Sequence, residues 1–289
     1  MSRLLYTNNI PFDMNDWNEK QIKDIFAGKN CIMAITESGE TLQKISNQEF
    51  MSRTQYWTRI KQIGISKWAE GAAIGLVEDG TCLIAKRPIR LMCEDRRLNF
   101  EHINDTVKSW KDVVQVAASD AFFALCADGT VRYVSFCERY QAEYEEIKEW
   151  REVIRIVTGV QNSIFGITKN GEILAAGTNA MNNKNYLSKF DDVIDVYPVG
   201  SECTDMYVLT TDGSVASVRN DLSNLNISNK FKKLDGHFNY KVFALMESQS
   251  VIDISAHNAK SVFPERNKIV SFAVGDSNYT IPFVVALCV

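Results

Sequence analysis

The sequence predicts an all-β fold, a seven-bladed β-propeller built from four-stranded antiparallel blades. Three observations support this prediction: a repeat with a period close to 40 residues, a glycine turn between two apolar runs in most copies, and a fragment of the repeat at each end of the chain. We expect residues 1–289 to form a single propeller domain, closed by N- and C-terminal strands that share one blade.

The repeat is clearest from Trp150, where WREVIRIVTGVQNSIFGITKNGEILAAGTN contains an aromatic residue, three apolar runs and a Gly-x-Asn ending. Each run has the length of a strand. Six copies open on an aromatic residue at positions 17, 57, 110, 150, 190 and 231, so their spacings are 40, 53, 40, 40 and 41 residues. A seventh copy opens near Arg266 without an aromatic residue. A fixed period of this length is typical of repeat architectures.

Short turns separate the second and third runs of the repeats. Glycine there favours a hairpin, because a type I′ turn needs positive φ at both central residues. An ordinary β-sandwich with several hairpins is the alternative, but turns in register with a recurring aromatic residue favour the ring. The turns are Ser38-Gly39, Asp79-Gly80, Asp128-Gly129, Asn170-Gly171 and Asp212-Gly213, with Ser248-Gln249 at the equivalent place in the sixth copy.

The seventh copy lacks its third run. Residues 3–6 can supply it, because LLYTNN at 4–9 matches LAAGTN at 174–179 in its apolar pattern and its final Asn. We therefore expect Val284 to Val289 to pair with Arg3 to Thr7. Pairing the two terminal strands in one blade closes a ring without leaving an open sheet edge.

The repeated pattern Trp-x-x-Val/Ile, Val-x-x-Gly, Ala-Leu-x-x-Asp-Gly-x-Val and Gly-x-Asn resembles the repeat of the regulator of chromosome condensation superfamily. The short blade is similar to those of bacterial members such as the second-type β-lactamase inhibitory protein. The resemblance implies a seven-bladed propeller, and blocking of an enzyme's active site as one form of protein binding. The chain departs from the family in having only 15 Gly and no Gly-Gln after Gly-x-Asn.

Composition places the chain among ordinary globular proteins. The net charge of −4 and the pI near 5.6 argue against the broad basic surface that nucleic-acid binding needs. The N-terminus has no long apolar core of a signal peptide, and no stretch approaches 18 apolar residues. We therefore expect a cytoplasmic monomer that binds neither nucleic acid nor membrane.

The seven cysteines do not form a metal or disulfide pattern. No Cys-x-x-Cys occurs, and the three histidines have no zinc-type spacing. We expect Cys31, Cys82, Cys126 and Cys288, in or beside apolar runs, to pack in the core. Residues Cys93, Cys137 and Cys203 are expected near loops as free thiols. No cofactor or metal is predicted, and no linear catalytic motif is present.

Loops that follow the first run of the repeats should gather at one end of the central channel. They are Gly28 to Asn30, Ser66 to Gly71, Gly159 to Asn162, Gly200 to Asp205 and Gly275 to Tyr279. They carry Glu70, Glu202, Asp205 and Asp276, which predicts an acidic rim without histidine. A solvated loop face is favoured there. The alternative is an enzyme, a hydrolase or lyase, with its site at the channel mouth.

The strongest candidate for an interface is an insertion of about 12 residues within 86–109, which holds six basic residues in an acidic chain. An acidic segment with two tyrosines follows at 138–149. Because arginine and aromatic side chains often anchor interfaces, we predict partner-binding residues Arg87, Arg90, Arg96, Arg97, Trp68, Tyr140, Tyr144 and Tyr279. Alternatively, the basic and acidic segments face each other or water.

These observations predict a non-catalytic protein-interaction module, an inhibitor or regulator of a partner protein. Guanine-nucleotide exchange, which the resemblance to the eukaryotic member suggests, is disfavoured because no projecting wedge can be identified in the sequence.

Overall fold

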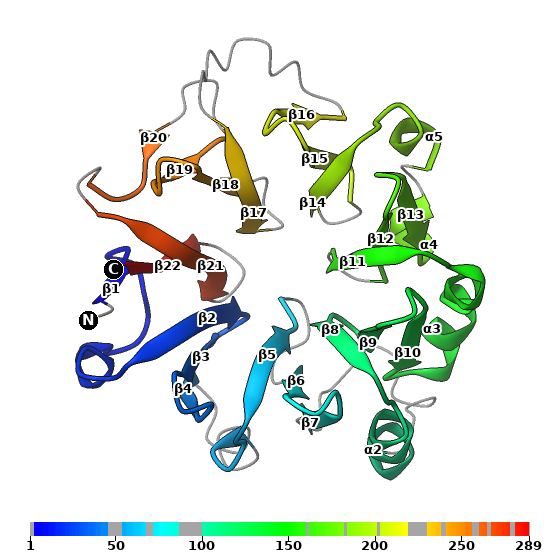
Figure 1. The fold of residues 1–289 in the computed structure, drawn as a ribbon, viewed down its shortest axis with the longest axis horizontal. Helices are drawn as coiled ribbons and strands as arrows, with labels where there is room; N and C mark the ends of the chain where they lie inside the picture. The colour runs from blue at the N-terminus through cyan, green and yellow to red at the C-terminus, as the bar shows by residue number, and fades with distance from the viewer. Residues whose placement is uncertain are drawn as a thin grey trace.

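In the computed structural model, the described residues form seven antiparallel sheets arranged in a ring around a central axis (Figure 1). The structure describes residues 3–45, 54–67, 72–86, 100–159, 162–181, 184–200, 203–218, 230–237, 241–255, 260–264, 267–277 and 281–288. Within these residues, six sheets have three strands and one has four. The chain is therefore mostly β, as the sequence predicts.

Each sheet points outward from the axis, with the first strand of each repeat innermost (Figure 1). Written from the innermost strand outward, the sheets are β2 (Ile22–Gly28), β3 (Cys31–Thr36) and β4 (Thr41–Ile45); β5 (Ile60–Ile65), β6 (Ala72–Val77) and β7 (Cys82–Lys86); β8 (Val113–Ala118), β9 (Ala121–Cys126) and β10 (Val131–Ser135); β11 (Val153–Thr158), β12 (Ile164–Thr168) and β13 (Ile173–Ala176); β14 (Val193–Val199), β15 (Asp205–Thr210) and β16 (Val215–Ser217); β17 (Phe231–His237), β18 (Lys241–Met246), β19 (Val251–Asp253) and β20 (Lys260–Ser261); and β21 (Ile269–Ser277), β22 (Ile281–Cys288) and β1 (Arg3–Tyr6).

Helices follow the third strand of several sheets, where the sequence predicted a fourth strand. Of the described sheets, only β17–β20 has four strands. Apolar residues spaced three or four apart explain the difference, because that spacing suits one face of a helix. Examples are Ile103 with Val107, and Tyr144 with Ile147, all buried. The helices are η1 (Asn15–Trp17), α2 (Phe100–Lys108), α3 (Glu138–Glu143), η3 (Glu145–Glu149), α4 (Thr178–Met181) and α5 (Lys184–Leu187).

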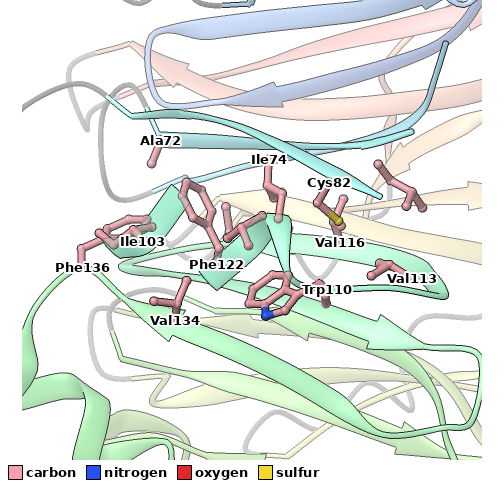
Figure 2. Close-up of a cluster of buried hydrophobic side chains, with 14 residues drawn as sticks. Ala72, Ile74, Cys82, Ile103, Trp110, Val113, Val116, Phe122, Val134 and Phe136 are labelled. Atoms are coloured by element: carbon pink, nitrogen blue, oxygen red, sulfur yellow. The ribbon is translucent and has the colours of Figure 1, made fainter. Parts of the chain in front are cut away.

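Apolar clusters fill the space between neighbouring sheets. In the described part of the chain there are seven such clusters, one for each neighbouring pair around the ring. Figure 2 shows the cluster between β5–β7 and β8–β10, where Trp110 lies beside Val113 and Cys82. Helix α2 adds Ile103 to it, near Phe122 and Phe136. Burying a large apolar side chain stabilises the fold by about 1.5–3 kcal/mol.

The recurring tryptophans pack on the middle strand of their own sheet. A Cβ at Gly75 would lie 2.9 Å from the Trp57 ring, and one at Gly166 would lie 2.8 Å from the Trp150 ring. The predicted opening at Phe231 is not equivalent to these positions. Phe231 is the first residue of β17 and pairs with Met246, as Val193 at the start of β14 pairs with Thr210. The sixth repeat therefore begins before Phe231.

The hairpin turns differ from the predicted type I′. In each described glycine turn, the residue before the glycine does not have a positive φ. The glycines themselves have φ between 77° and 82°. The glycine N–H donates to the carbonyl three residues earlier, as in Gly39 to Thr36 at 2.9 Å. This geometry is a type I turn followed by a left-handed residue. Gln249 takes the same place with φ 64°.

Each of these turns also holds the next sheet in the ring. The carbonyl of Gly39 accepts from the N–H of Ile60 at 3.1 Å, and the carbonyl of Gly171 accepts from the N–H of Val193 at 3.3 Å. The carbonyl of Gln249 accepts from Ile269 in the same way at 2.8 Å. The turn predicted from each glycine therefore connects two sheets as well as two strands.

The terminal strands share one sheet. Strand β1 pairs antiparallel with β22, with Arg3 opposite Cys288 and Leu5 opposite Ala286. The Thr7 N–H donates to the Val284 carbonyl at 3.1 Å. The predicted pairing of the two ends is confirmed, and Leu4 enters the core between this sheet and β2–β4.

Polar side chains connect the innermost strands laterally. Each of these strands has a β-bulge after its first residue, and the residue beyond the bulge is polar. We call this set the belt: Asp24, Gln62, Gln115, Arg155, Asp195, Lys233 and Ser271. There are seven junctions between neighbouring innermost strands. Within the described residues, a belt side chain forms a hydrogen bond across six of them.

The belt bonds are well formed. The Gln115 amide donates to the Ile156 carbonyl and accepts from the Ile156 N–H, both at 2.8 Å. Arg155 Nε donates to Asp195 Oδ1 at 2.9 Å, and Ser271 Oγ donates to Asp24 Oδ1 at 2.7 Å. The junction between β2 and β5 is held by backbone hydrogen bonds instead. Each such bond contributes about 0.5–1.5 kcal/mol and fixes the height of one sheet against the next.

Removing a terminal strand should damage the whole ring. Deletion of residues 284–289 removes most of β22, exposes an edge of β21 and leaves β1 without its partner. The loss should approach the 5–15 kcal/mol of a typical domain, so we expect aggregation or a much lower melting temperature. Thermal unfolding measures this, with removal of residues 1 and 2 as the control. Near-normal melting of the truncated protein would contradict a structural role for the shared sheet.

Two turn glycines should differ in their tolerance of alanine. Both have positive φ, 77° at Gly171 and 80° at Gly80. A Cβ would meet Asp192 Cα at 2.6 Å in the first case, but its nearest neighbour is 3.4 Å away in the second. Left-handed strain costs about 1–2 kcal/mol at either position, and crowding adds about 1–3 kcal/mol at Gly171 only. Urea unfolding should show that Gly171→Ala is less stable than Gly80→Ala. Equal losses of stability would contradict the close packing of the Gly171 turn against Asp192.

Candidate functional site

At one end of the axis of the ring, the loops that follow the innermost strands lie close together. We call this end the hairpin mouth. Its loops contact one another: the Lys29 N–H donates to the Ser66 carbonyl at 3.2 Å, and the Asn30 N–H donates to the Asp276 carbonyl at 2.9 Å. The Cys203 thiol donates to Ser163 Oγ at 3.2 Å. The predicted gathering of these loops at one end is therefore present.

Lys67 reaches across the axis of the ring at this mouth. It follows β5, whereas its contacts lie on β14 and β17 on the opposite side of the ring (Figure 1). Its ammonium group donates to the Gly236 carbonyl at 3.0 Å, pairs closely with the Asp235 carboxylate, and lies 4.9 Å from the centre of the Tyr197 ring. One side chain thus connects three innermost strands.

Burial and charge set the protonation of this cluster. Burial lowers the pKa of Lys67, and the facing Asp235 carboxylate opposes that shift. Burial raises the pKa of Tyr197 well above its usual value, so its hydroxyl remains a neutral donor to the Gly236 carbonyl. Asp235 also accepts the N–H groups of Gly236 at 2.8 Å and Val274 at 2.9 Å. The carboxylate is therefore held by protein donors on several sides.

A buried histidine and carboxylate lie beside this cluster. His237 Nε2 is 2.9 Å from Asp276 Oδ2, and the two side chains are only 3% and 2% exposed. Asp205, also 2% exposed, accepts from Ser217 Oγ at 2.9 Å. The prediction of a solvated acidic rim without histidine is therefore wrong for Asp205 and Asp276.

The physical reason is that His237 lies 39 residues from Asp276 and meets it only when neighbouring sheets pack. The other two acids predicted at this mouth are Glu70 and Glu202, and both lie outside the described residues.

The mouth cluster has acid–base groups, but its contacts are internal. A general base must reach a substrate proton, and His237 is almost fully enclosed. In the described part of the chain, no group of three His, Cys, Asp or Glu side chains is placed to hold a metal ion. The geometry of the cluster is that of a clamp between strands.

The predicted partner-binding tyrosines lie in or next to α3. Tyr144 is buried, and its hydroxyl donates to Asp120 Oδ1 at 2.7 Å. Its ring packs edge-on against Phe123 with centroids 5.1 Å apart. Its prediction as a partner-binding residue is therefore wrong, because the helical turn directs Tyr144 and Ile147 into the core. Tyr140 is partly buried against the same cluster.

Asp120 is buried beneath α3 with Tyr144. Ser119 Oγ also donates to Asp120 Oδ1, at 2.8 Å. Burial raises the pKa of the Asp120 carboxyl, and the bonds from Tyr144 and Ser119 oppose the shift. This pair is a second internal polar contact that sequence reasoning missed, because Asp120 and Tyr144 are 24 residues apart.

The insertion is described in part. Its last residues form α2, whose Ile103 and Val107 are buried between β7 and β10, so this half supports the core. Residues Arg87, Arg90, Arg96 and Arg97, with Trp68 and Tyr279, lie outside the described residues. Their role in binding stays a prediction.

The cysteines are mostly core residues. Cys31, Cys82, Cys126 and Cys288 are buried, as predicted, and burial raises the pKa of Cys82 to about 12. Cys137 and Cys203 are free of disulfides but fully buried. Cys93 lies outside the described residues.

The first residues of the innermost strands lie at the strand ends away from the hairpin mouth, toward the outside of the ring (Figure 1). The residue within each bulge, second in its strand, is exposed or half-buried. We call these seven the rim: Lys23, Lys61, Val114, Ile154, Ile194, Lys232 and Val270. Three of them are among the most exposed large apolar residues described: Val114 at 43%, Ile154 at 57% and Val270 at 44%. Sequence analysis missed this set, although its position in each repeat was visible.

Comparison with known proteins gives a fold. No protein-family model matches the chain, and no curated protein matches it by sequence. Among solved structures, human WBSCR16 has a TM-score of 0.66 at 12% identity, covering 94% of this chain and 88% of that one. Yeast Prp20p has a TM-score of 0.61 at 12% identity, covering 96% and 84%. The Arabidopsis thaliana ACR4 ectodomain has a TM-score of 0.56 at 11% identity, covering 89% of each chain.

These similarities establish a propeller fold like that of yeast RCC1 (Prp20), in agreement with the resemblance seen in the repeats. At these identities they establish the fold alone. Among the described residues no helix is both long and apolar enough to cross a membrane.

The Lys67 clamp should stabilise the ring in a coupled way. Lys67→Met and Asp235→Asn each remove one side of the pair, so each should cost about 1–3 kcal/mol. The double variant should show a coupling energy of about 0.5–3 kcal/mol in urea unfolding. Lys61→Met, at an exposed lysine of β5, the strand that precedes Lys67, is the control and should change stability by less than about 0.5 kcal/mol. Additive losses would contradict the clamp.

Proposed function

We propose that the chain is a seven-bladed propeller, closed by the blade that the two termini share, and that it acts as a non-catalytic protein-binding module. One contrast between the two ends of the innermost strands carries this proposal. The ionisable groups of the hairpin mouth are engaged with one another, whereas the rim presents exposed apolar side chains such as Ile154. Exposed apolar groups held on a rigid frame suit binding to another macromolecule.

Solved structures with this fold support protein binding in general. Yeast Prp20p has been examined for its binding to Gsp1p and histones, and yeast RCC1 (Prp20) has been crystallised with Kap60 bound. Those partners belong to those proteins. For this chain we infer only the class of partner, another protein.

The mechanism is rigid display. Neighbouring sheets are fixed by belt contacts such as Gln115 to Ile156, so the loops and strand ends that they carry are fixed as well. Little ordering entropy is then lost when a partner binds, and a broad, shallow surface can be complementary.

The insertion remains a proposed contact surface through its arginines at 87, 90, 96 and 97. Binding there could regulate or inhibit the partner, as the resemblance to the second-type β-lactamase inhibitory protein implies. The cytoplasmic location and the monomeric state expected from the sequence belong to the same proposal.

An enzyme with its site at the hairpin mouth is the second candidate. The observation that favours it is Asp276 Oδ1, a buried oxygen without a hydrogen-bond partner among the described residues, next to His237. In that case a His237→Gln variant would lose turnover of a small substrate while keeping its fold. Under the binding proposal, the same variant loses stability and keeps its protein partner.

Charge reversal of the insertion tests the proposed interface. The intact protein is first used to capture partners from its native cell, and these are identified by mass spectrometry. Exposed charges contribute little to folding, so Arg90→Glu, Arg96→Glu and Arg97→Glu together should weaken capture at least tenfold with an unchanged melting temperature. Reversal of Lys20, Lys111 and Arg132, which are exposed on the body, is the control. Undiminished capture would place the contact elsewhere; no specific capture at all would contradict the proposed function.

A further inference from the structure

We propose that Asp120 and Tyr144 form a pH-sensitive latch, which holds α3 and η3 against the sheet β8–β10 while Asp120 is protonated and releases them when it ionises. Tyr144 belongs to the apolar cluster between this sheet and β11–β13, so the latch lies at one joint of the ring. The inference concerns a conformational change built into the fold and does not depend on the proposed function.

Asp120 holds the chain on both sides of α3. It lies in the turn between β8 and β9. Its backbone carbonyl accepts from the Phe136 N–H at 3.1 Å, before the helix, and its carboxyl accepts from the Tyr144 hydroxyl at 2.7 Å, after the helix. Asp120 therefore attaches both ends of α3 to the inner hairpin of its sheet.

The two oxygens of the Asp120 carboxyl have different surroundings. Oδ1 accepts from Tyr144 at 2.7 Å and from Ser119 at 2.8 Å. Oδ2 is buried and has no hydrogen-bond partner among the described residues. A carboxylate carries charge on both oxygens, so burying one of them without a donor is costly. A protonated carboxyl carries its hydrogen on one oxygen and accepts at the other, so the arrangement fits a proton on Oδ2.

No cation compensates a negative charge at Asp120. The residue is 2% exposed and takes part in none of the ion pairs found in the described part of the chain. Ser119, from its own turn, and Tyr144 contribute neutral hydroxyls, and the N–H groups of Asp120 and Asn162 contribute weaker support for the charged form. Burial outweighs these donors and raises the pKa of the Asp120 carboxyl.

The charged side chains of the α3–η3 segment do not favour ionisation of Asp120 either. Glu143 precedes Tyr144 and is acidic, and its Oε2 is also buried without a partner among the described residues. The charges of Asp120 and Glu143 both raise the pKa of Tyr144. Lys148, in η3, pairs with Glu145. Ionisation of Asp120 thus adds an uncompensated charge beneath an acidic segment.

The raised pKa fixes the direction of the pH response. Asp120 has the ordinary aspartate pKa of about 4 in the unfolded chain. Between that value and its raised pKa, the folded protein keeps a proton that the unfolded chain has lost, so stability falls as the pH rises. The contribution of the closed latch is fully present below the ordinary pKa and is lost as the pH rises through the raised pKa of Asp120.

Release of the segment relieves the buried charge because it admits water to Asp120. Tyr144 then leaves its edge-on contact with Phe123, and the bond from the Gly177 N–H to the Glu143 carbonyl, 3.2 Å long, is broken. That bond connects α3 to the chain that follows β13 in the next sheet. Release therefore exposes part of β10 and loosens one joint of the ring, while the strands remain folded.

Hydrogen exchange of backbone amides, measured from about pH 5 to about pH 9, tests this inference. Each rate is divided by the rate of an unstructured peptide at the same pH, which gives a protection factor. The amides of Tyr144 and Ile147 donate within the segment. Their protection should fall about tenfold or more as the pH rises, while that of the β11 amides should change by less than about twofold.

Asp120→Asn is the matched variant, because its amide is neutral at every pH and can accept from the same two hydroxyls at Oδ1. Protection of the segment should stay level in this variant. Asp128→Asn changes an exposed carboxyl in the β9–β10 turn of the same sheet and should keep the pH response of the unaltered protein. Infrared difference spectra give a second readout: the carbonyl band of a protonated carboxyl should persist above the ordinary aspartate pKa and be absent from Asp120→Asn.

Three results would overturn the latch. Protection of the segment that does not depend on pH would contradict it, and so would an equal fall in the β11 amides, since release would then be global unfolding. A pH response that persists in Asp120→Asn would assign the titration to another group. If Asp120→Asn does not fold, the unaltered protein decides: loss of the infrared band and loss of protection at the same pH support the latch, and losses at different pH values refute it.

Discussion

Lateral hydrogen bonding between the innermost strands is the constraint on which the rest of this structure depends. A sheet of three short strands cannot stand alone, and packing of apolar faces does not by itself fix how far one sheet slides along the next. The belt supplies that register, through contacts such as Arg155 to Asp195. Its contact between Ser271 and Asp24 joins residues 247 positions apart and connects the shared terminal sheet to the first one.

Predictions that depend on neighbouring residues were the ones that succeeded. The apolar runs, the turn glycines and the pairing of residues near the two termini could be inferred because each is visible in a short stretch of sequence. The helices were missed where strands were expected, although Ile103 and Val107 have helical spacing. The turn type was also wrong, because Asp-Gly suits both type I′ and a type I turn with a left-handed glycine.

The site was less predictable because it is assembled from distant residues. Lys67 meets Asp235, 168 positions away, and nothing local to either residue indicates that contact. The same holds for His237 and Asp276, which turned an expected acidic rim into a buried pair. The two ends of the innermost strands therefore differ: residues after the strands are engaged with each other, and side chains near the strand starts face solvent. We take that difference as the basis for the proposed binding.

Native-state hydrogen exchange of backbone amides tests most directly whether the seven sheets behave as one closed ring. The account predicts that the most protected amides of β22, which hold β1, open with the same free energy as those of β9, far from either terminus. A shared opening energy means that the terminal sheet unfolds only with the whole molecule. If the β22 amides exchanged several kcal/mol more easily than those of β9, the terminal sheet would be an independent unit, and the closed ring would be contradicted.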